Sequence, residues 1–154
     1  MIEKLFTEKT VAVDVAAKDW EEAVRAGGKL LVAAGCAEES YVTAMLDNIR
    51  RMGQYIVIAP GLAMPHARPE CGVKRIGMGL VRLSSPVCFG NEEYDPVDLL
   101  ITFCAVDQST HIEALAELMQ IIEDEEFLEQ VRSGMEKDAI LDYIQTKKFI
   151  KADD

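Results

Sequence analysis

The sequence predicts an α/β fold: a single domain with a central mixed β-sheet flanked by helices on both faces. Three observations predict it. Short runs with the alternation of β-strands, such as residues 10–15, come between longer segments with the period of helices. The run 97–106 is almost continuously apolar, as expected for a strand that is covered on both faces. The 154 residues suit one domain and leave no room for two ordinary ones.

The N-terminal part is expected to form a strand and then a helix. Residues 10–15 place three valines on one face of a strand. Asp19 and Glu22, three residues apart, are typical of a helix start, and Gly35 is suited to a helix end. We therefore expect the first helix to lie between Asp19 and Gly35.

A second helix and a second strand are expected before the middle of the chain. The helix should start near Ser40 and end at Gly53, because apolar side chains recur there every three or four residues: Tyr41, Met45, Ile49 and Met52. The run 55–59 is rich in β-branched residues and is closed by Pro60 and Gly61, which indicates a short strand.

The remaining elements alternate in the same way. Glycines and a Ser-Ser-Pro group interrupt the apolar stretches of residues 75–89, so two strands around a turn are expected there. The apolar run 97–106 follows as the central strand. A third helix should run from Thr110 to about Ile122 on the stripe Ile112, Leu115, Met119 and Ile122. Two shorter helices are expected at 125–133 and 137–145.

Composition and charge exclude several classes of protein. There are 27 acidic and 16 basic residues, a net charge of −11, so nucleic acid is not expected as a partner. The acidic surface either serves solubility alone or favours a basic protein partner. Since there is no apolar run of about 20 residues and no apolar signal core, we expect a cytoplasmic protein. The domain should span 1–154, with an ordered core over about 5–146 and a frayed tail at 147–154.

The cysteines do not have the spacing of a metal site. They are far apart and no Cys-x-x-Cys occurs, so no zinc site is expected. All have small or apolar neighbours, which indicates buried and reduced thiols at Cys36, Cys71, Cys88 and Cys104.

The two histidines of the chain are both candidates for a site. His66 lies in residues 60–70, where three prolines and a glycine indicate a stiff loop, and Pro65 restricts the backbone just before it. His111 lies in a Thr-x-x-Glu capping box, which places it in the first position of a helix, beside an end that attracts anions. Both follow predicted strands, so the two imidazoles can meet if those strands are parallel neighbours. Taken singly, each histidine is explained equally well as a loop or capping residue without a role.

The residues around His66 resemble a known family. Residues 61–67 read Gly-Leu-Ala-Met-Pro-His-Ala, which is similar to the G-x-x-x-P-H active-site motif of mannitol/fructose-type (type-2) IIA components of the bacterial sugar phosphotransferase system, the PTS EIIA type-2 family. The similarity covers nearly the whole chain. It is greatest to the ascorbate-type IIA components, through Tyr-x-Val-Ile-Ala-Pro-Gly-Leu-Ala-Met-Pro-His at 55–66 and Asp-Pro-Val-Asp at 95–98.

This resemblance implies a phosphoryl relay. A IIA component takes the phosphoryl group from the carrier protein HPr and passes it to a IIB component, which serves the IIC membrane permease. The resemblance implies that His66 is the phosphoacceptor, as a tele-phosphohistidine, and that His111 supports the transfer. No metal or organic cofactor is implied. Histidine suits such a relay because its ordinary pKa of about 6.5 leaves much neutral imidazole at pH 7.

One departure from the family concerns the positive charge near the phosphohistidine. The mannitol branch carries an arginine where this sequence has Asn48. Arg50, Arg51 and Arg68 are the nearby alternatives, and the sequence does not choose between phosphate contact and a solvated surface position for any of them. We also expect Leu62, Ala63 and Met64 to form an apolar docking centre for basic partner surfaces.

Two other functions remain as hypotheses. One is a regulatory protein of the same fold, whose phosphorylation state controls a target protein. The other is a cysteine hydrolase, which is disfavoured because no cysteine lies in a nucleophile motif.

Overall fold

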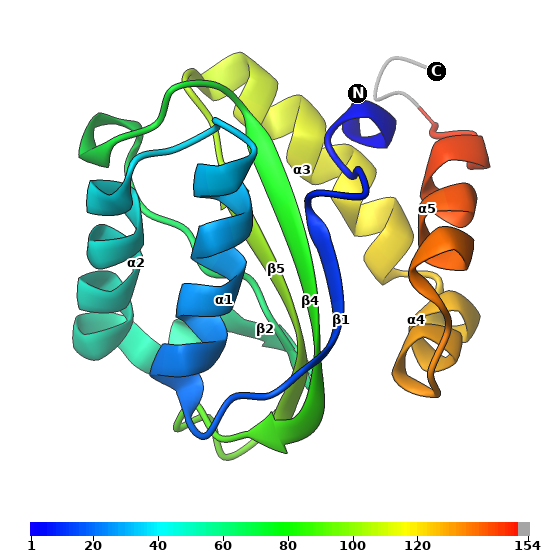
Figure 1. Cartoon of the computed structure of the whole chain (residues 1–154), viewed down its shortest axis with the longest axis horizontal. Helices are drawn as coiled ribbons and strands as arrows, with labels where there is room; N and C mark the ends of the chain where they lie inside the picture. Colours follow the sequence, from blue (N-terminus) through cyan, green and yellow to red (C-terminus); the bar gives the residue numbers. More distant parts are fainter. Residues whose placement is uncertain (151–154) are drawn as a thin grey trace.

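A five-stranded sheet lies between two layers of helices in the computed structural model, which describes residues 1–150 (Figure 1). The strand order is β1-β4-β5-β3-β2. The β1/β4 and β3/β5 pairs are parallel, whereas β4/β5 and β2/β3 are antiparallel. The strands are β1 Val11–Val15, β2 Val57–Ala59, β3 Leu62–Ala63, β4 Gly77–Val87 and β5 Val97–Cys104. The predicted mixed sheet is confirmed, and the apolar run places β5 at its centre.

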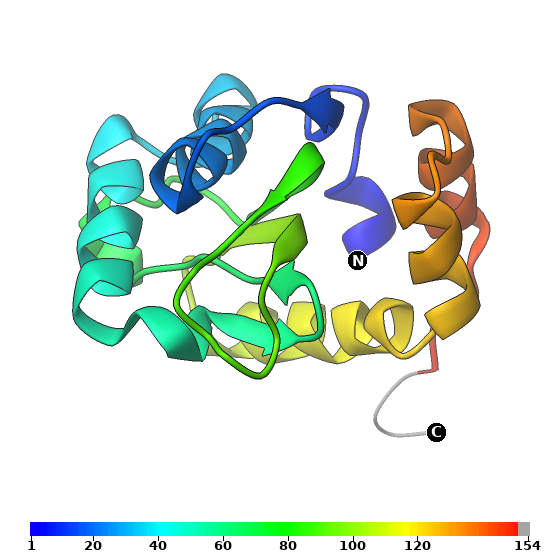
Figure 2. The ribbon, with the colours of Figure 1, turned by 90° about the horizontal axis from the view of Figure 1, so that it is seen from below.

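The helices cover both faces of the sheet, as predicted. Figures 1 and 2 show α1 and α2 on one face, and α3, α4 and α5 with the N-terminal turn on the other. Each face has its own apolar core. The helices are α1 Trp20–Ala33, α2 Glu39–Met52, α3 Gln108–Ile122, α4 Glu125–Arg132 and α5 Lys137–Thr146, with short 3₁₀ turns at Ile2–Lys4, Gly53–Ile56 and Pro69–Cys71.

The predicted limits of α1 are confirmed. The carboxylate of Asp19 accepts a hydrogen bond from the backbone N–H of Glu22 at 2.9 Å. At the other end, Gly35 has a φ of +77°, a conformation that glycine adopts without the steric cost of a Cβ atom.

The two strands expected in residues 75–89 are one continuous strand, β4. Gly77 and Gly79, which we expect to interrupt the apolar stretches, belong to this strand, and their neighbours leave no room for a side chain at either position. A Cβ atom at Gly77 would lie 2.6 Å from the sulfur of Cys36. The exposed segment 84–86 lies within an irregularity of the pairing with β5, between the paired residues Arg82 and Val87.

Helix α1 packs closely on the sheet at Thr102, a fully buried residue of β5. The Thr102 hydroxyl donates a hydrogen bond to the carbonyl of Gly27 at 3.2 Å. A Cβ atom at Gly27 would lie 2.4 Å from the Thr102 methyl group, and one at Gly79 would lie 2.8 Å from its hydroxyl oxygen. This close approach of helix and sheet therefore depends on glycine at both positions.

The start of α3 differs from the prediction. The N-cap is Asp107, whose carboxylate accepts the N–H of Thr110 at 2.8 Å, so His111 is the fourth helical residue and not the first. Both Asp107 and Thr110 satisfy local capping preferences, and the earlier residue starts the helix. The apolar stripe is also shifted: Ile112 is 60% exposed, and the fully buried residues are Ala114, Leu118 and Ile121.

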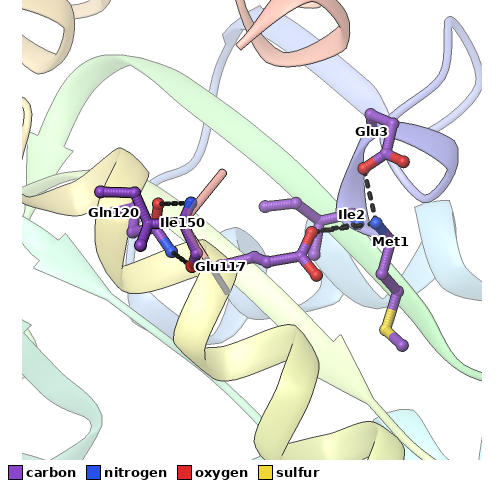
Figure 3. Close-up of polar contacts among 6 residues, drawn as sticks. All are labelled: Met1, Ile2, Glu3, Glu117, Gln120 and Ile150. Carbon is purple, nitrogen blue, oxygen red and sulfur yellow. Dashed lines mark hydrogen bonds and ion pairs between the residues drawn. The ribbon is translucent and has the colours of Figure 1, made fainter. Parts of the chain in front are cut away.

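Packing extends beyond the expected core of 5–146 at both ends of the described chain. Ile2 is fully buried, and its backbone N–H donates to Glu117 of α3 at 3.2 Å. The Met1 ammonium bonds to Glu117 at 3.0 Å and to Glu3 at 2.6 Å (Figure 3). Gln120 of α3 exchanges two hydrogen bonds with the backbone of Ile150, at 2.7 and 2.8 Å (Figure 3). In the expected frayed tail, Ile150 is thus bonded to α3, and 151–154 lie outside the described residues.

The cysteines match the prediction only in part. All four are free thiols, but Cys71 is half-buried and Cys88 is exposed. Cys36 and Cys104 are buried, and burial raises the pKa of the Cys104 thiol to about 12. In the part of the chain that the structure describes, no cluster of three or more His, Cys, Asp or Glu side chains could hold a metal ion. Across residues 1–150, no helix is both long enough and apolar enough to span a membrane.

Candidate active site

His66 and His111 line one pocket of about 540 Å³. The pocket is formed by α2, by the loop after β3, by the end of β5 and by the start of α3. Both histidines are half-buried. Other lining residues include Tyr41, Asn48, Arg51, Arg68 and Phe103. The two histidines thus lie together, but not through the strand that we expect at 55–59, because β2 is not a neighbour of β5.

The pairing of β3 with β5 brings the histidines together. These strands are parallel neighbours, with Leu62 opposite Leu99 and Ala63 opposite Leu100, so their carboxyl ends meet at one edge of the sheet. The backbone N–H of Phe103 donates to the carbonyl of Pro65 at 3.1 Å, directly before His66. Residues 62–63, which we expected to be part of the loop, thus form the strand that positions it.

The imidazole of His66 is oriented by a hydrogen bond to its own loop. Its Nδ1 lies 2.9 Å from the carbonyl oxygen of Met64. A carbonyl oxygen can only accept, so Nδ1 carries the proton, and in the neutral ring Nε2 then holds the free lone pair. The contact therefore leaves the lone pair of Nε2 free of this hydrogen bond.

Two side chains of α2 hold the backbone around His66. The amide of Asn48 donates to the carbonyl of His66 at 3.3 Å. The hydroxyl of Tyr41 accepts the N–H of Ala67 at 2.9 Å and lies 2.7 Å from the carbonyl oxygen of Phe103. Tyr41 is fully buried, and this burial raises its pKa far above the ordinary value. From the sequence, Tyr41 is expected on the apolar stripe of this helix, and its hydroxyl is the signal there of a buried hydrogen-bond partner.

His111 is held more loosely. Its backbone N–H donates to the carbonyl of Asp107 at 3.2 Å, and its ring meets the Phe103 ring edge-on, with 4.9 Å between centroids. The Asp107 carboxylate accepts the backbone N–H and the hydroxyl of Thr110 and the hydroxyl of Ser109, which holds the pKa of this carboxyl below its usual range. The anion site that we expected at this helix end is thus already occupied by the chain's own carboxylate.

The three arginines of the sequence analysis have different surroundings. Arg50 forms ion pairs with Glu21 at 3.1 Å and Asp47 at 2.9 Å, and it does not line the histidine pocket. Arg51 and Arg68 do line it. Within residues 1–150 neither of these two forms an ion pair, so both are available to an anion in the pocket.

The apolar surface near the site differs from the expected docking centre. Leu62 and Ala63 are fully buried and Met64 is 9% exposed, because β3 is inserted beside β5. Other apolar side chains are exposed instead. They lie near His66 or in the segment around His111, and we call them the apolar rim: Met52, Tyr55, Val106 and Ile112.

The chain is similar over most of its length to known proteins of one family. The sequence profile of the family described as "Phosphoenolpyruvate-dependent sugar phosphotransferase system, EIIA 2" matches residues 4–147. The ascorbate-specific PTS system EIIA component of Escherichia coli K12 is 44% identical over 143 residues, which cover 92% of this chain and 93% of that protein. The solution structure of the mannitol-specific cryptic phosphotransferase enzyme IIA CmtB from Escherichia coli is 37% identical, with a TM-score of 0.86 over 95% of this chain and 99% of that one.

A further solved structure shows a relative with its partner. It is a complex of enzyme IIA of the mannitol system with phosphorylated enzyme IIB from Escherichia coli. The IIA chain is 26% identical to this one, with a TM-score of 0.79, and the match covers 92% of this chain and 98% of that one.

Proposed function

Because the chain belongs to the EIIA type-2 family of the phosphoenolpyruvate-dependent sugar phosphotransferase system, whose members are phosphotransferase components, we propose that His66 carries the phosphoryl group in this chain. The observation that supports the assignment is the hydrogen bond from Nδ1 of His66 to the Met64 carbonyl. It directs the lone pair of Nε2 away from the loop, and the product would be a tele-phosphohistidine. Within residues 1–150, no comparable hydrogen bond selects one of the ring nitrogens of His111.

The transfer needs an imidazole nucleophile and a phosphohistidine donor. The lone pair of Nε2 forms the new N–P bond, and the electrons of the donor's N–P bond return to the donor imidazole. The Nδ1–H of His66 stays bonded to the Met64 carbonyl, which stabilises the positive charge that develops on the ring. Phosphoryl transfer depends mainly on positioning and electrostatics, so no cofactor is required.

Arg51, Arg68 and His111 are the groups that we assign to the charge on the phosphoryl oxygens. All three line the pocket with His66. Both arginines lack a partner carboxylate within residues 1–150, and cationic donors form strong hydrogen bonds to phosphate. Asn48 stands where the mannitol branch has an arginine, and its amide is used for the His66 carbonyl. We therefore expect Arg51, one turn further along α2, to supply charge at this side of the pocket.

The partners proposed for this chain are HPr as phosphodonor and a IIB component as phosphoacceptor, with a IIC membrane permease downstream. The solved complex of a related IIA with phosphorylated IIB supports the second partner. We propose that both proteins dock on the apolar rim, which replaces the buried residues 62–64 as the contact surface. Similarity to the ascorbate-specific component favours an ascorbate-type system. A relay fed by phosphoenolpyruvate also places the proposed activity in the cytoplasm.

The alternative role is a regulatory EIIA-like protein with the same site. One experiment separates the two roles and tests the relay. The chain is incubated with phosphoenolpyruvate, enzyme I, HPr and candidate IIB proteins, and the phosphoryl group is followed by intact mass. We expect a gain of one phosphoryl group that then moves to an ascorbate-type IIB. Labelling without transfer to any IIB would favour the regulator, and no labelling by HPr would overturn the proposed relay.

A further inference from the structure

The hydroxyl of Tyr41 bonds to both segments that carry the histidines. It accepts the backbone N–H of Ala67, the residue after His66, at 2.9 Å. It lies 2.7 Å from the carbonyl oxygen of Phe103 and 3.1 Å from that of Ala67, and its single proton is donated to one of them at a time. The ring of Phe103 in turn contacts His111 edge-on. One oxygen atom thus connects the His66 loop to the residue that packs against His111.

We propose that Tyr41 is a positioning residue for phosphoryl transfer, because its hydroxyl fixes the His66 loop against the end of β5 so that both imidazoles face one pocket. The inference rests on the proposed function of His66. Tyr41 acts through the backbone of Ala67 and Phe103 and needs no contact with the phosphoryl group.

The geometry separates this role from that of the Tyr41 ring. The ring is fully buried in the core under α2, where a phenylalanine would fill the same space. Replacing Tyr41 by phenylalanine removes only the oxygen and leaves the half-buried backbone of Ala67 and the buried carbonyl of Phe103 without this partner. The bonds from Phe103 to Pro65 and from Asn48 to His66 remain. The loop should therefore stay attached to the sheet but lose its fixed position at Ala67.

The test compares Tyr41→Phe with Tyr143→Phe as a matched control. The Tyr143 hydroxyl also makes a hydrogen bond, to Asp124 at 2.5 Å, but it lies on α5 and does not line the histidine pocket. For each variant we would measure thermal unfolding, the tautomer of His66 from its side-chain ¹⁵N shifts, and single-turnover transfer from phosphorylated HPr. In Tyr41→Phe we expect a folded protein, a mixture of His66 tautomers and transfer slowed about 10- to 100-fold, as for other small misplacements of reacting groups. In Tyr143→Phe neither the tautomer nor the rate should change.

The remaining outcomes either overturn the proposal or leave its decision to a second measurement. A folded Tyr41→Phe variant with the wild-type tautomer and rate would overturn it, as would a loss of rate that only matches the unfolded fraction. If the variant does not fold, amide hydrogen exchange of the unsubstituted protein decides: protection of the Ala67 N–H supports its bond to Tyr41, and unprotected exchange refutes it. If HPr fails to label even the unsubstituted protein, the proposed function fails, and the tautomer comparison alone then tests Tyr41.

Discussion

The two histidine-bearing segments are held in contrasting ways. The backbone around His66 is bonded at four consecutive residues to other parts of the fold: Met64 to Ile56, Pro65 to Phe103, His66 to Asn48 and Ala67 to Tyr41. The segment before His111 is exposed from Val106 to Ser109, and among residues 1–150 the His111 ring makes an edge contact with Phe103 and no hydrogen bond. A nucleophile must be held in one place, whereas a supporting donor can adjust to a charge that grows during the reaction.

The sharpest test of this contrast is removal of the fixed imidazole. His66→Ala should abolish HPr-dependent labelling while leaving the fold intact, because the ring is half-buried and its hydrogen bond is made to its own loop. Intact mass after incubation with phosphoenolpyruvate, enzyme I and HPr measures the labelling. His111→Ala is the control and should still be labelled. Full labelling of His66→Ala would place the phosphoryl group elsewhere.

Removal of the His111 imidazole should slow phosphoryl transfer, and the phosphoryl group should still be attached to His66. For His111→Ala we expect transfer to be slower by about 10²–10³-fold, the usual effect of losing one donor to a developing charge. Rapid-quench kinetics would give the rate, and acid-labile phosphate should still be found on His66. An unchanged rate would show that His111 only packs against Phe103.

Loss of an arginine should slow phosphoryl transfer more when the arginine lines the pocket than when it lies beside it. Arg51→Gln and Arg68→Gln should each slow transfer by about tenfold, because each removes a charged donor from the pocket. Arg50→Gln is the matched control, since Arg50 is engaged with Glu21 and Asp47. Single-turnover transfer from phosphorylated HPr gives all three rates. If Arg51→Gln and Arg68→Gln transfer the phosphoryl group as fast as Arg50→Gln, then Arg51 and Arg68 are solvated surface residues.

The smallest expected effect concerns the anchoring of the looser segment. Hydrogen bonds from Thr110 and Ser109 lower the pKa of Asp107, so this cap contributes stability above the ordinary aspartate pKa of about 3.9 and loses it as the pH falls through the lower value in the fold. Asp107→Ala should lower the unfolding temperature at pH 7 by a few degrees, and the difference from the unsubstituted protein should shrink in acid. Thermal unfolding between pH 3 and pH 7 measures it. A difference that stays constant over this range would contradict the assigned cap.

The arrangement of the two histidines was predictable only in part. The apolar run of β5 and the stiff loop at His66 both show in the sequence, but the parallel partner of β5 is β3, whose two residues are too few to show a strand pattern. The role of the Tyr41 hydroxyl was not predictable, because its partners are 26 and 62 residues away. The continuity of β4 was missed for the same reason: Gly77 indicates a turn unless the sulfur of Cys36 is known to lie beside it.

The contact of α1 with the sheet has a consequence for mutational scans. Thr102 occupies the space that a side chain at Gly27 or Gly79 would need, and none of the three residues lines the histidine pocket. Most single-nucleotide changes at a glycine codon introduce a larger residue. In a deep mutational scan, both positions should therefore tolerate almost no substitution, including alanine. A method that locates active sites from intolerance alone would mark a second centre there, although these glycines perform no chemistry.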